Sequence, residues 1–309
     1  MVARPSKRPP VPPYRRVELS TPGHDLKMLR KAAATASDLV LMDLEDGCAP
    51  GQKVAARAVV AEAARTLDWG SRVVAFRPNG IGTSYFLDDL LEVVGAAGEH
   101  LDLLVLPKVR SAEEVRYVDR LLHQIEWKFS LEPGRLALEV LIETAAGVLH
   151  AEEIARSSPR LRALLFGIYD YAGEIGATVG PESYAEVQFA KQATLAAARS
   201  AGLLALDGIT SRFKDLELTR SEAESSRRMG FDGKWAIHPG QVEVIQQVFT
   251  PTDEELERAE HRVELYRSAG AEGKGAIALG EEMVDEATLR TEERRVALGR
   301  HLGRLRGKA

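Results

Sequence analysis

The sequence predicts a closed (β/α)₈ barrel, and two observations carry this prediction. Apolar runs rich in Val, Ile and Leu recur at intervals of roughly 30 residues, and each is followed by a segment with helical spacing. Runs that are apolar throughout are typical of strands in a parallel sheet that is covered by helices. Eight such units before residue 250 match one barrel of ordinary size.

The predicted strands are residues 16–19, 39–44, 72–77, 103–107, 136–142, 161–168, 203–206 and 235–237. The predicted helices between them include residues 25–36, 53–66, 112–129, 184–201 and 216–229. An open, doubly wound sheet is the alternative. We favour the barrel because no G-x-G-x-x-G motif follows the first strand, and because polar residues of interest follow several strands instead of meeting at one crevice.

The composition limits the classes of function. The 309-residue chain has a net charge of −5, which argues against a nucleic-acid partner. Its single cysteine, Cys48, excludes an internal disulfide. We expect that no positive or basic partner adjoins this thiol, and that it packs instead of reacting. Neither a membrane span nor a signal peptide is indicated, so we expect a cytoplasmic protein without a membrane partner.

The chain is predicted to have three parts, and their bounds are residues 1–13, 14–250 and 251–309. The first is a basic, proline-rich and disordered arm, the second is the barrel, and the third is a C-terminal extension. In the extension a charged helix begins at Thr252, residues 270–276 form a glycine-rich link, and residues 288–305 form a final helix. Such an extension suits oligomerisation or a lid over an active site.

Two of the apolar runs end in a carboxylate. Glu143 follows the run at residues 136–142, and Asp170 follows the run at residues 161–168. Because the C-terminal strand ends form the active-site rim of a barrel, two acids from successive units can converge on one hard cation. We therefore predict a Mg²⁺ site. The alternative is that each acid caps the helix that follows it.

Other strand ends bring charges of both signs to the same rim. Asp43, Glu45 and Asp46 lie at the end of the second predicted strand, Arg77 ends the third, and Lys108 follows the fourth. This combination suits an anionic substrate that is chelated to a cation, with arginine as the donor to a carboxylate or enolate oxygen. The alternative for Arg77 is a salt bridge to Glu45 or Asp46 that only balances charge.

These residues lie in motifs that follow one another along the chain. The motifs are STPGHD (20–25), LMDLED (41–46), RPNG (77–80), LPK (106–108), IETA (142–145), FGIYD (166–170) and GKWAIHP (233–239). In this order they resemble the motifs of the HpcH/HpaI aldolase and citrate lyase β-subunit family, and most of all its malyl-CoA lyase branch. The resemblance implies a (β/α)₈ lyase dependent on Mg²⁺ or Mn²⁺, which cleaves a 3-hydroxyacyl-CoA to an acyl-CoA and a 2-oxo acid, or runs the reverse condensation.

The resemblance also implies roles for the charged residues of the rim. It assigns Glu143 and Asp170 as the metal ligands, and Arg77 as the residue that contacts substrate near the reacting carbons. Glu45 and Asp46 are then better candidates for orienting metal-bound water than for binding the metal directly.

Contacts with coenzyme A are implied in the same way. Lys27 and Lys31 correspond to basic residues that hold the CoA phosphates, and Ile237 and His238 match a segment that touches CoA. From the residues alone, His238 is equally well a rim residue packed under a loop. Asp285 corresponds to a catalytic aspartate on an extension that closes over a neighbouring subunit, which implies a homo-oligomer, a trimer or a hexamer.

The chain also departs from the family pattern. Ser20 and Thr21 replace an apolar pair that could cover the adenine, and Pro78 stiffens the backbone beside Arg77. Three alternatives to the lyase remain open: a citryl-CoA lyase component like the citrate lyase β-subunit, a catalytically silent barrel that binds CoA or a metabolite, and a phosphotransfer or hydrolytic barrel with the same metal. No glycine-rich phosphate loop supports the last.

Overall fold

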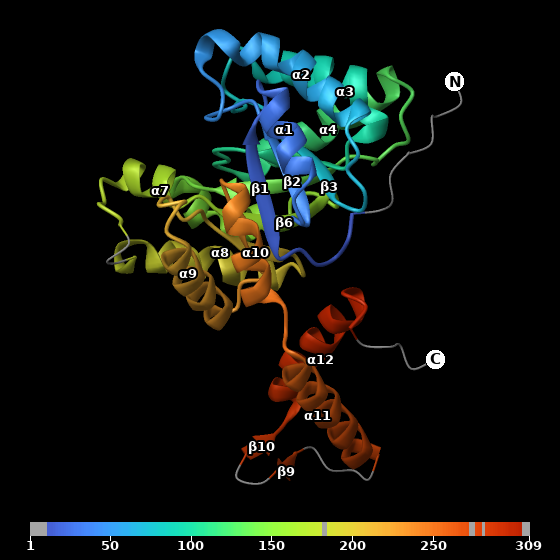
Figure 1. Ribbon diagram of the computed structural model, residues 1–309, viewed down its shortest axis with the longest axis vertical. Coiled ribbons are helices and arrows are strands. Elements are labelled where there is room, and N and C mark those ends of the chain that lie inside the picture. Colours follow the sequence, from blue (N-terminus) through green and yellow to red (C-terminus); the bar gives the residue numbers. More distant parts are fainter. Residues whose placement is uncertain (1–10, 181–183, 272–275, 280–281, 305–309) are drawn as a thin grey trace. The chain divides into compact units, whose positions relative to one another are not determined.

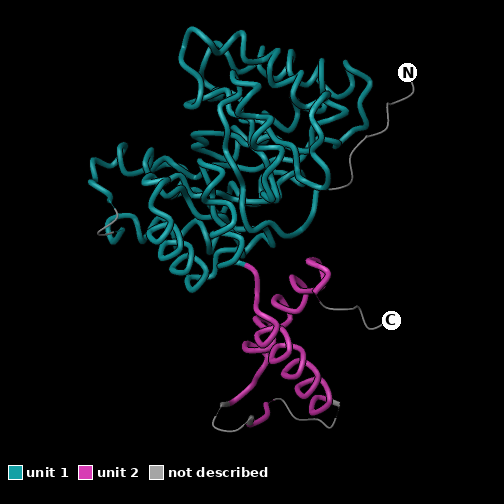
Figure 2. Tube along the Cα trace, viewed as in Figure 1, with its two compact units in different colours: residues 1–249 teal, residues 250–309 magenta. Residues whose placement is uncertain are grey.

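The computed structural model describes residues 11–180, 184–271, 276–279 and 282–304. The chain divides into two compact units, Met1–Phe249 and Thr250–Ala309 (Figure 2). In the first unit, eight parallel strands close into a barrel in sequence order, and helices lie around the outside of the strands (Figure 1). The predicted (β/α)₈ barrel is therefore confirmed.

The barrel strands are β1 (Val17–Pro22), β2 (Leu39–Asp43), β3 (Val73–Arg77), β4 (Leu103–Leu106), β5 (Ala137–Ile142), β6 (Leu161–Phe166), β7 (Leu204–Asp207) and β8 (Gly233–Ala236). Each overlaps a predicted strand. The largest difference is at β1, which continues past the apolar run because its backbone pairs with β2 as far as Pro22 and Asp43. Pairing with a neighbour extends a strand that side-chain pattern alone would end earlier.

The helices of the first unit are α1 (Leu26–Ala33), α2 (Lys53–Thr66), α3 (Phe86–Ala97), α4 (Ala112–Lys128), α5 (Ala145–Leu149), α6 (Ala151–Ala155), α7 (Ile168–Ile175), α8 (Gln188–Ser200), α9 (Leu216–Met229) and α10 (Pro239–Phe249). Polar caps set where several of them begin. Asp25 accepts hydrogen bonds from the first turn of α1, Ser111 does so for α4, and Asp215 for α9.

Alternation along the strands decides which side chains enter the barrel. Leu39 and Leu41 of β2 pack inside the barrel, and so do Val73 and Ala75 of β3. Because side chains on one face recur at every second residue, the next inward position is Asp43 on β2 and Arg77 on β3. By the same alternation, the inward-facing positions of β5 lead to Glu143, which lies one residue past the end of the strand.

The N-terminal end of the barrel is closed by charged side chains that are paired. Arg15 donates to Glu18 over 2.8 Å and also to Glu139, and all three side chains are completely buried. Val11 packs against the apolar cluster inside the barrel. Residues 1–10 of the predicted arm lie outside the described residues.

The second unit is a pair of helices with a short antiparallel pair of strands between them: α11 (Asp253–Ala271), β9 (Ile277–Leu279), β10 (Glu282–Val284) and α12 (Glu286–His301). Thr252 and Glu255 form a reciprocal cap at the start of α11. Val263 of α11 and Val296 of α12 lie in one apolar cluster. Of the predicted glycine-rich link, residues 272–275 lie outside the described residues. Within the described chain, no helix combines the length and apolarity that a membrane crossing needs.

Candidate active site

A pocket with a cavity volume of about 290 Å³ lies at the C-terminal ends of the barrel strands. Its lining includes Asp46, Arg77, Glu143, Asp170 and Ile237, which the sequence analysis named as site residues, together with further apolar side chains such as Phe166 and Trp235. The structure thus brings the predicted metal ligands and the predicted arginine into one cavity. This is the end of the barrel where enzymes of this fold carry their active sites.

Arg77 is held in one orientation by several contacts. Its Nε and Nη2 donate to the two carboxylate oxygens of Asp43 over 2.7 and 2.6 Å. Its Nη1 lies 2.9 Å from Oε2 of Glu45, an ion pair by distance without the alignment of a hydrogen bond. The ring of Trp235 lies 5.4 Å from its Cζ. Burial alone would lower the pKa of Arg77, but the charge of Asp43 raises it above its ordinary value.

Asp43 was the unrecognised partner of this arginine. The predicted alternative named Glu45 or Asp46, whereas the bidentate contact is made by Asp43, and Glu45 makes the weaker one. Asp43 also accepts the backbone N–H groups of Glu45 and Gly47, so it shapes the loop that follows β2. The alternation of β2 was the signal that could have selected it.

Glu143 is a buried carboxyl group with one oxygen held and the other kept clear. Its Oε1 accepts the backbone N–H of Lys108 over 2.8 Å. A Cβ at position 167 would come within 2.4 Å of Oε2. Any residue other than glycine at this position would therefore crowd this oxygen. Burial, reinforced by the charges of Asp170 and Glu45, raises the pKa of Glu143 to about 8, although Arg77 opposes the shift.

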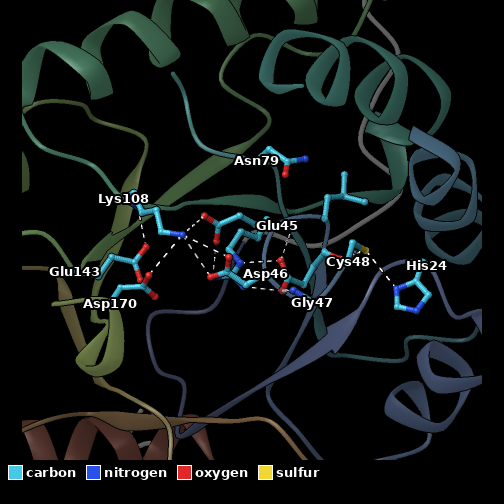
Figure 3. Close-up of polar contacts among 12 residues, drawn as sticks. His24, Glu45, Asp46, Gly47, Cys48, Asn79, Lys108, Glu143 and Asp170 are labelled. Carbon is cyan, nitrogen blue, oxygen red and sulfur yellow. Dashed lines mark hydrogen bonds and ion pairs between the residues drawn. The ribbon is translucent and has the colours of Figure 1, made fainter. Parts of the chain in front are cut away.

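Asp170 lies beside Glu143, in the first turn of α7 (Figure 3). Its side chain is 41% exposed, so it reaches solvent where Glu143 does not. The capping alternative does not describe Glu143, because α5 is capped by Thr144, whose hydroxyl accepts the N–H of Gly147. The residue that precedes α7 is Gly167, which has no side chain to cap it.

Lys108 is the functional residue that sequence reasoning left without a role. Its ammonium lies 2.7 Å from Oε1 of Glu45, 3.4 Å from Asp46 and 3.5 Å from Asp170, so it stands among the acids of the rim (Figure 3). Its backbone has a positive φ of 54°, which turns its N–H toward Glu143. Burial opposes its charge, but the bond to Glu45 and the nearby carboxylates raise the pKa of Lys108, which stays protonated.

Cys48 has a basic neighbour in space that the sequence did not reveal. Nδ1 of His24 lies 3.4 Å from Sγ of Cys48, so the prediction that no basic residue adjoins this thiol is wrong. The thiol is buried and donates to the backbone oxygen of Asp43. Burial, together with the charge of Asp43, raises the pKa of the thiol, which agrees with a packed cysteine and not with a nucleophile.

The residues predicted to contact CoA lie at or near the rim. Lys27 and Lys31 are exposed and one turn apart on α1, so both ammonium groups project from one face of that helix. Ile237 lines the pocket, whereas His238 is exposed and its ring stacks on Phe213 at 5.0 Å. His238 is thus a rim residue, but it is exposed and not buried under a loop.

Asp285 belongs to the second unit, where it caps α12. Its Oδ1 accepts the N–H of Thr288 over 3.0 Å and the hydroxyl of Thr288 over 3.1 Å. These hydrogen bonds, that from the Thr288 N–H first, lower the pKa of Asp285. The side chain is therefore held in its ionised form.

The two carboxylates fit a hard divalent cation. In the described part of the chain no group of three or more His, Cys, Asp or Glu is arranged as a ligand set. Mg²⁺, however, is commonly held by one or two carboxylates, with substrate oxygens and water completing its shell. The oxygen of Glu143 that Gly167 leaves clear, beside the partly exposed Asp170, meets that requirement.

The fold and the site together define an α/β-barrel enzyme with carboxylates and an arginine in one pocket. The sequence pattern of the HpcH/HpaI aldolase/citrate lyase family matches residues 16–239. The chain is 38% identical over 303 residues to an L-malyl-CoA/beta-methylmalyl-CoA lyase of Cereibacter sphaeroides, covering 92% of this chain and 95% of the relative. It is 35% identical to a (3S)-malyl-CoA thioesterase of the same organism, with coverages of 92% and 94%.

A solved structure agrees. The CitE protein from Mycobacterium tuberculosis, in complex with magnesium, acetoacetate and coenzyme A, superposes with a TM-score of 0.74 at 30% identity, covering 92% of this chain and 98% of that one. The chain belongs to the HpcH/HpaI aldolase/citrate lyase family. The family resemblance found in the motifs is thereby confirmed.

Proposed function

We propose that the protein is a Mg²⁺-dependent carbon–carbon lyase, for which Mn²⁺ can substitute. It cleaves a 3-hydroxyacyl-CoA of the malyl-CoA, methylmalyl-CoA or citramalyl-CoA type to an acyl-CoA and a 2-oxo acid, or catalyses the reverse condensation. The observation that carries this proposal is one pocket in which a rigidly held Arg77 faces the carboxylate pair Glu143 and Asp170. The relatives named as malyl-CoA lyase and the CitE complex with magnesium and coenzyme A support the same chemistry.

Glu143 and Asp170 would hold the metal. When bound, Mg²⁺ polarises the hydroxyl and carboxylate oxygens of the substrate. Glu143 would serve as a ligand only when it is ionised, and its burial opposes that ionisation until a cation binds. Glu45 and Asp46 stand next to this pair and hold Lys108 beside it.

Arg77 provides the main transition-state contact in this proposal. Cleavage of the carbon–carbon bond leaves negative charge on the oxygen of a thioester enolate. Nη1 and Nη2 of Arg77 each carry a second N–H beyond the contacts to Glu45 and Asp43. Because Asp43 already fixes the guanidinium, it needs no reorganisation as the charge develops.

Asp285 transfers the proton at the carbon of the acyl-CoA, from the extension of a neighbouring subunit in a cytoplasmic trimer or hexamer. Its ionised state suits removal of that proton in the condensing direction. Lys27 and Lys31 hold the CoA phosphates, while Ile237 and His238 line the path of the CoA chain.

The test is a panel of malyl-, methylmalyl-, citramalyl- and citryl-CoA, incubated with the purified chain with and without Mg²⁺. We expect release of a 2-oxo acid from at least one ester, and only with the metal. Release of free CoA thiol without a 2-oxo acid would contradict the proposal and indicate thioester hydrolysis, the activity for which one relative is named. Turnover of citryl-CoA alone would favour a citrate lyase component.

A further inference from the structure

The loop after β2 carries Glu45 and Asp46, and it is fastened by a lysine from outside the pocket. Nζ of Lys53, the first residue of α2, donates to the backbone oxygens of Leu44 over 3.1 Å and Glu45 over 2.6 Å. Its third contact is Oδ1 of Asn79. All three acceptors are uncharged, so this ammonium acts as a clamp on the loop and not as an ion-pair partner.

Lys53 is itself braced by a closed ring of side chains. Asn79 accepts from Lys53, and its side-chain and backbone N–H groups donate to Oδ2 of Asp89 over 2.7 and 2.9 Å. Oδ1 of Asp89 accepts Nε of Arg57 over 2.8 Å. Since Lys53 and Arg57 lie one turn apart on α2, the helix completes the ring. Asn79, Asp89 and Arg57 are buried, so the ring is rigid.

The far side of the loop contacts the reacting region. The carboxylate of Glu45, whose backbone oxygen Lys53 holds, lies 2.9 Å from Nη1 of Arg77 and 2.7 Å from Nζ of Lys108. A shift of the Glu45 backbone therefore moves the partner of both cations. Lys53 is not among the described residues that line this pocket, so we expect its influence on the reaction to be indirect, through the Glu45 backbone that it holds.

We propose that Lys53 is a positioning residue for the reaction, which sets Glu45 and through it Arg77 and Lys108. The inference rests on the proposed function, and it assigns a role to a residue outside the catalytic machinery. The physical reason is that a displacement of about 1 Å in a catalytic group can cost on the order of 10²-fold in rate. The brace through Asn79 keeps the loop from such a displacement.

The variant Lys53→Met tests this, because it keeps the apolar stem and removes the three donors. We expect kcat for 2-oxo acid release to fall by about 10- to 100-fold, with a much smaller change in KM. Arg72→Met is the matched control. Arg72 also donates to backbone oxygens, those of Thr35 and Trp69, but at the opposite end of β3. The Arg72→Met substitution should lower the unfolding midpoint and leave kcat unchanged.

Chemical rescue separates positioning from folding. Lys53→Cys, treated with 2-bromoethylamine, regains an amine at nearly the length of lysine, and we expect most of kcat to return. The parent treated in the same way controls for Cys48. Unchanged kcat in Lys53→Met, or a treated Lys53→Cys that stays slow although its unfolding midpoint is restored, would overturn the inference alone. A parent that releases no 2-oxo acid would overturn both the inference and the proposed function.

Discussion

Each end of the barrel buries an arginine between two carboxylates, and we propose only the C-terminal end as the active site. At the N-terminal end Arg15 binds Glu18 and Glu139, and the three side chains are completely enclosed. At the C-terminal end Arg77 contacts Asp43 and Glu45. The pocket that Arg77 lines is also lined by Asp46, Glu143 and Asp170. An arginine between two acids is therefore not in itself a catalytic feature.

The difference lies in charge balance and space. The charged groups of the C-terminal end are Asp43, Glu45, Asp46, Glu143, Asp170, Arg77 and Lys108. When all five carboxyl groups are ionised they outnumber the two cations, and this excess of negative charge beside a cavity favours a bound cation. At the N-terminal end burial raises the pKa of Glu18 although Arg15 opposes the shift, and the side chains of Arg15, Glu18 and Glu139 are completely buried.

The largest expected effect is loss of the ligand pair. Glu143→Ala and Asp170→Ala should each abolish release of 2-oxo acid while leaving the fold intact, because a hard cation loses an oxygen ligand with each truncation. Glu139→Gln is the control at the other end of the barrel, and its kcat should match that of the parent. If Asp170→Ala keeps parental activity, the metal site is misassigned.

Loss of Asp285 should abolish activity as loss of a metal ligand does. A second chain that retains Asp285 should restore part of that activity. Asp285→Ala alone should be inactive, since it lacks the carboxylate that we propose transfers the proton. Mixed at equal ratio with Glu143→Ala under conditions that exchange subunits, it should regain about a quarter of parental activity, because that fraction of barrels combines an intact metal site with an intact Asp285. If the mixture stays inactive although mixed oligomers form, Asp285 does not act across subunits.

The two arginines should respond differently to the same substitution. Arg77→Lys keeps the charge but loses the planar fork that Asp43 fixes, and kcat should fall by roughly 10²-fold, as for loss of one oxyanion donor. Arg15→Lys should lower the unfolding midpoint and leave kcat unchanged. If kcat is equal in Arg77→Lys and the parent, Arg77 only balances charge.

A smaller effect concerns stability without metal. In the folded state the pKa of Glu143 is about 8, above its ordinary value of 4.5. Between these pH values the folded chain binds more protons than the unfolded chain, so its free energy of unfolding falls as pH rises. Relative to Glu143→Gln, the parent in EDTA should lose on the order of a few kcal/mol across this window. If the urea midpoints of the parent and of Glu143→Gln change in parallel between pH 5 and 8, this prediction is wrong.

Strand alternation and strand ends made much of the site predictable. Arg77, Glu143 and Asp170 were selected because each lies at or just after an apolar run, and the structure brings them into one pocket. The positive φ of Lys108 was not predictable, because that conformation is rare for residues other than glycine and carries no sequence signal here. It is this turn that places the Lys108 N–H on Glu143.

Contacts between residues far apart in the chain were the other part that escaped prediction. The choice of Asp43 over Glu45 as the main partner of Arg77 depends on which side chain points inward. The approach of His24 to Cys48 depends on how the loops after β1 and β2 pack. Strand alternation could have selected Asp43, but local propensity and spacing contain no information on how two loops pack.

Metal binding tests most directly the claim that excess charge makes the C-terminal end the cation site. Mn²⁺ titrated into the metal-free protein and followed by electron paramagnetic resonance counts the ions bound per chain. The account predicts one ion for the parent and for Glu139→Gln, and a sharply weakened site in Glu143→Gln and Asp170→Ala. Equal binding by all four proteins, or binding lost only in Glu139→Gln, would contradict it.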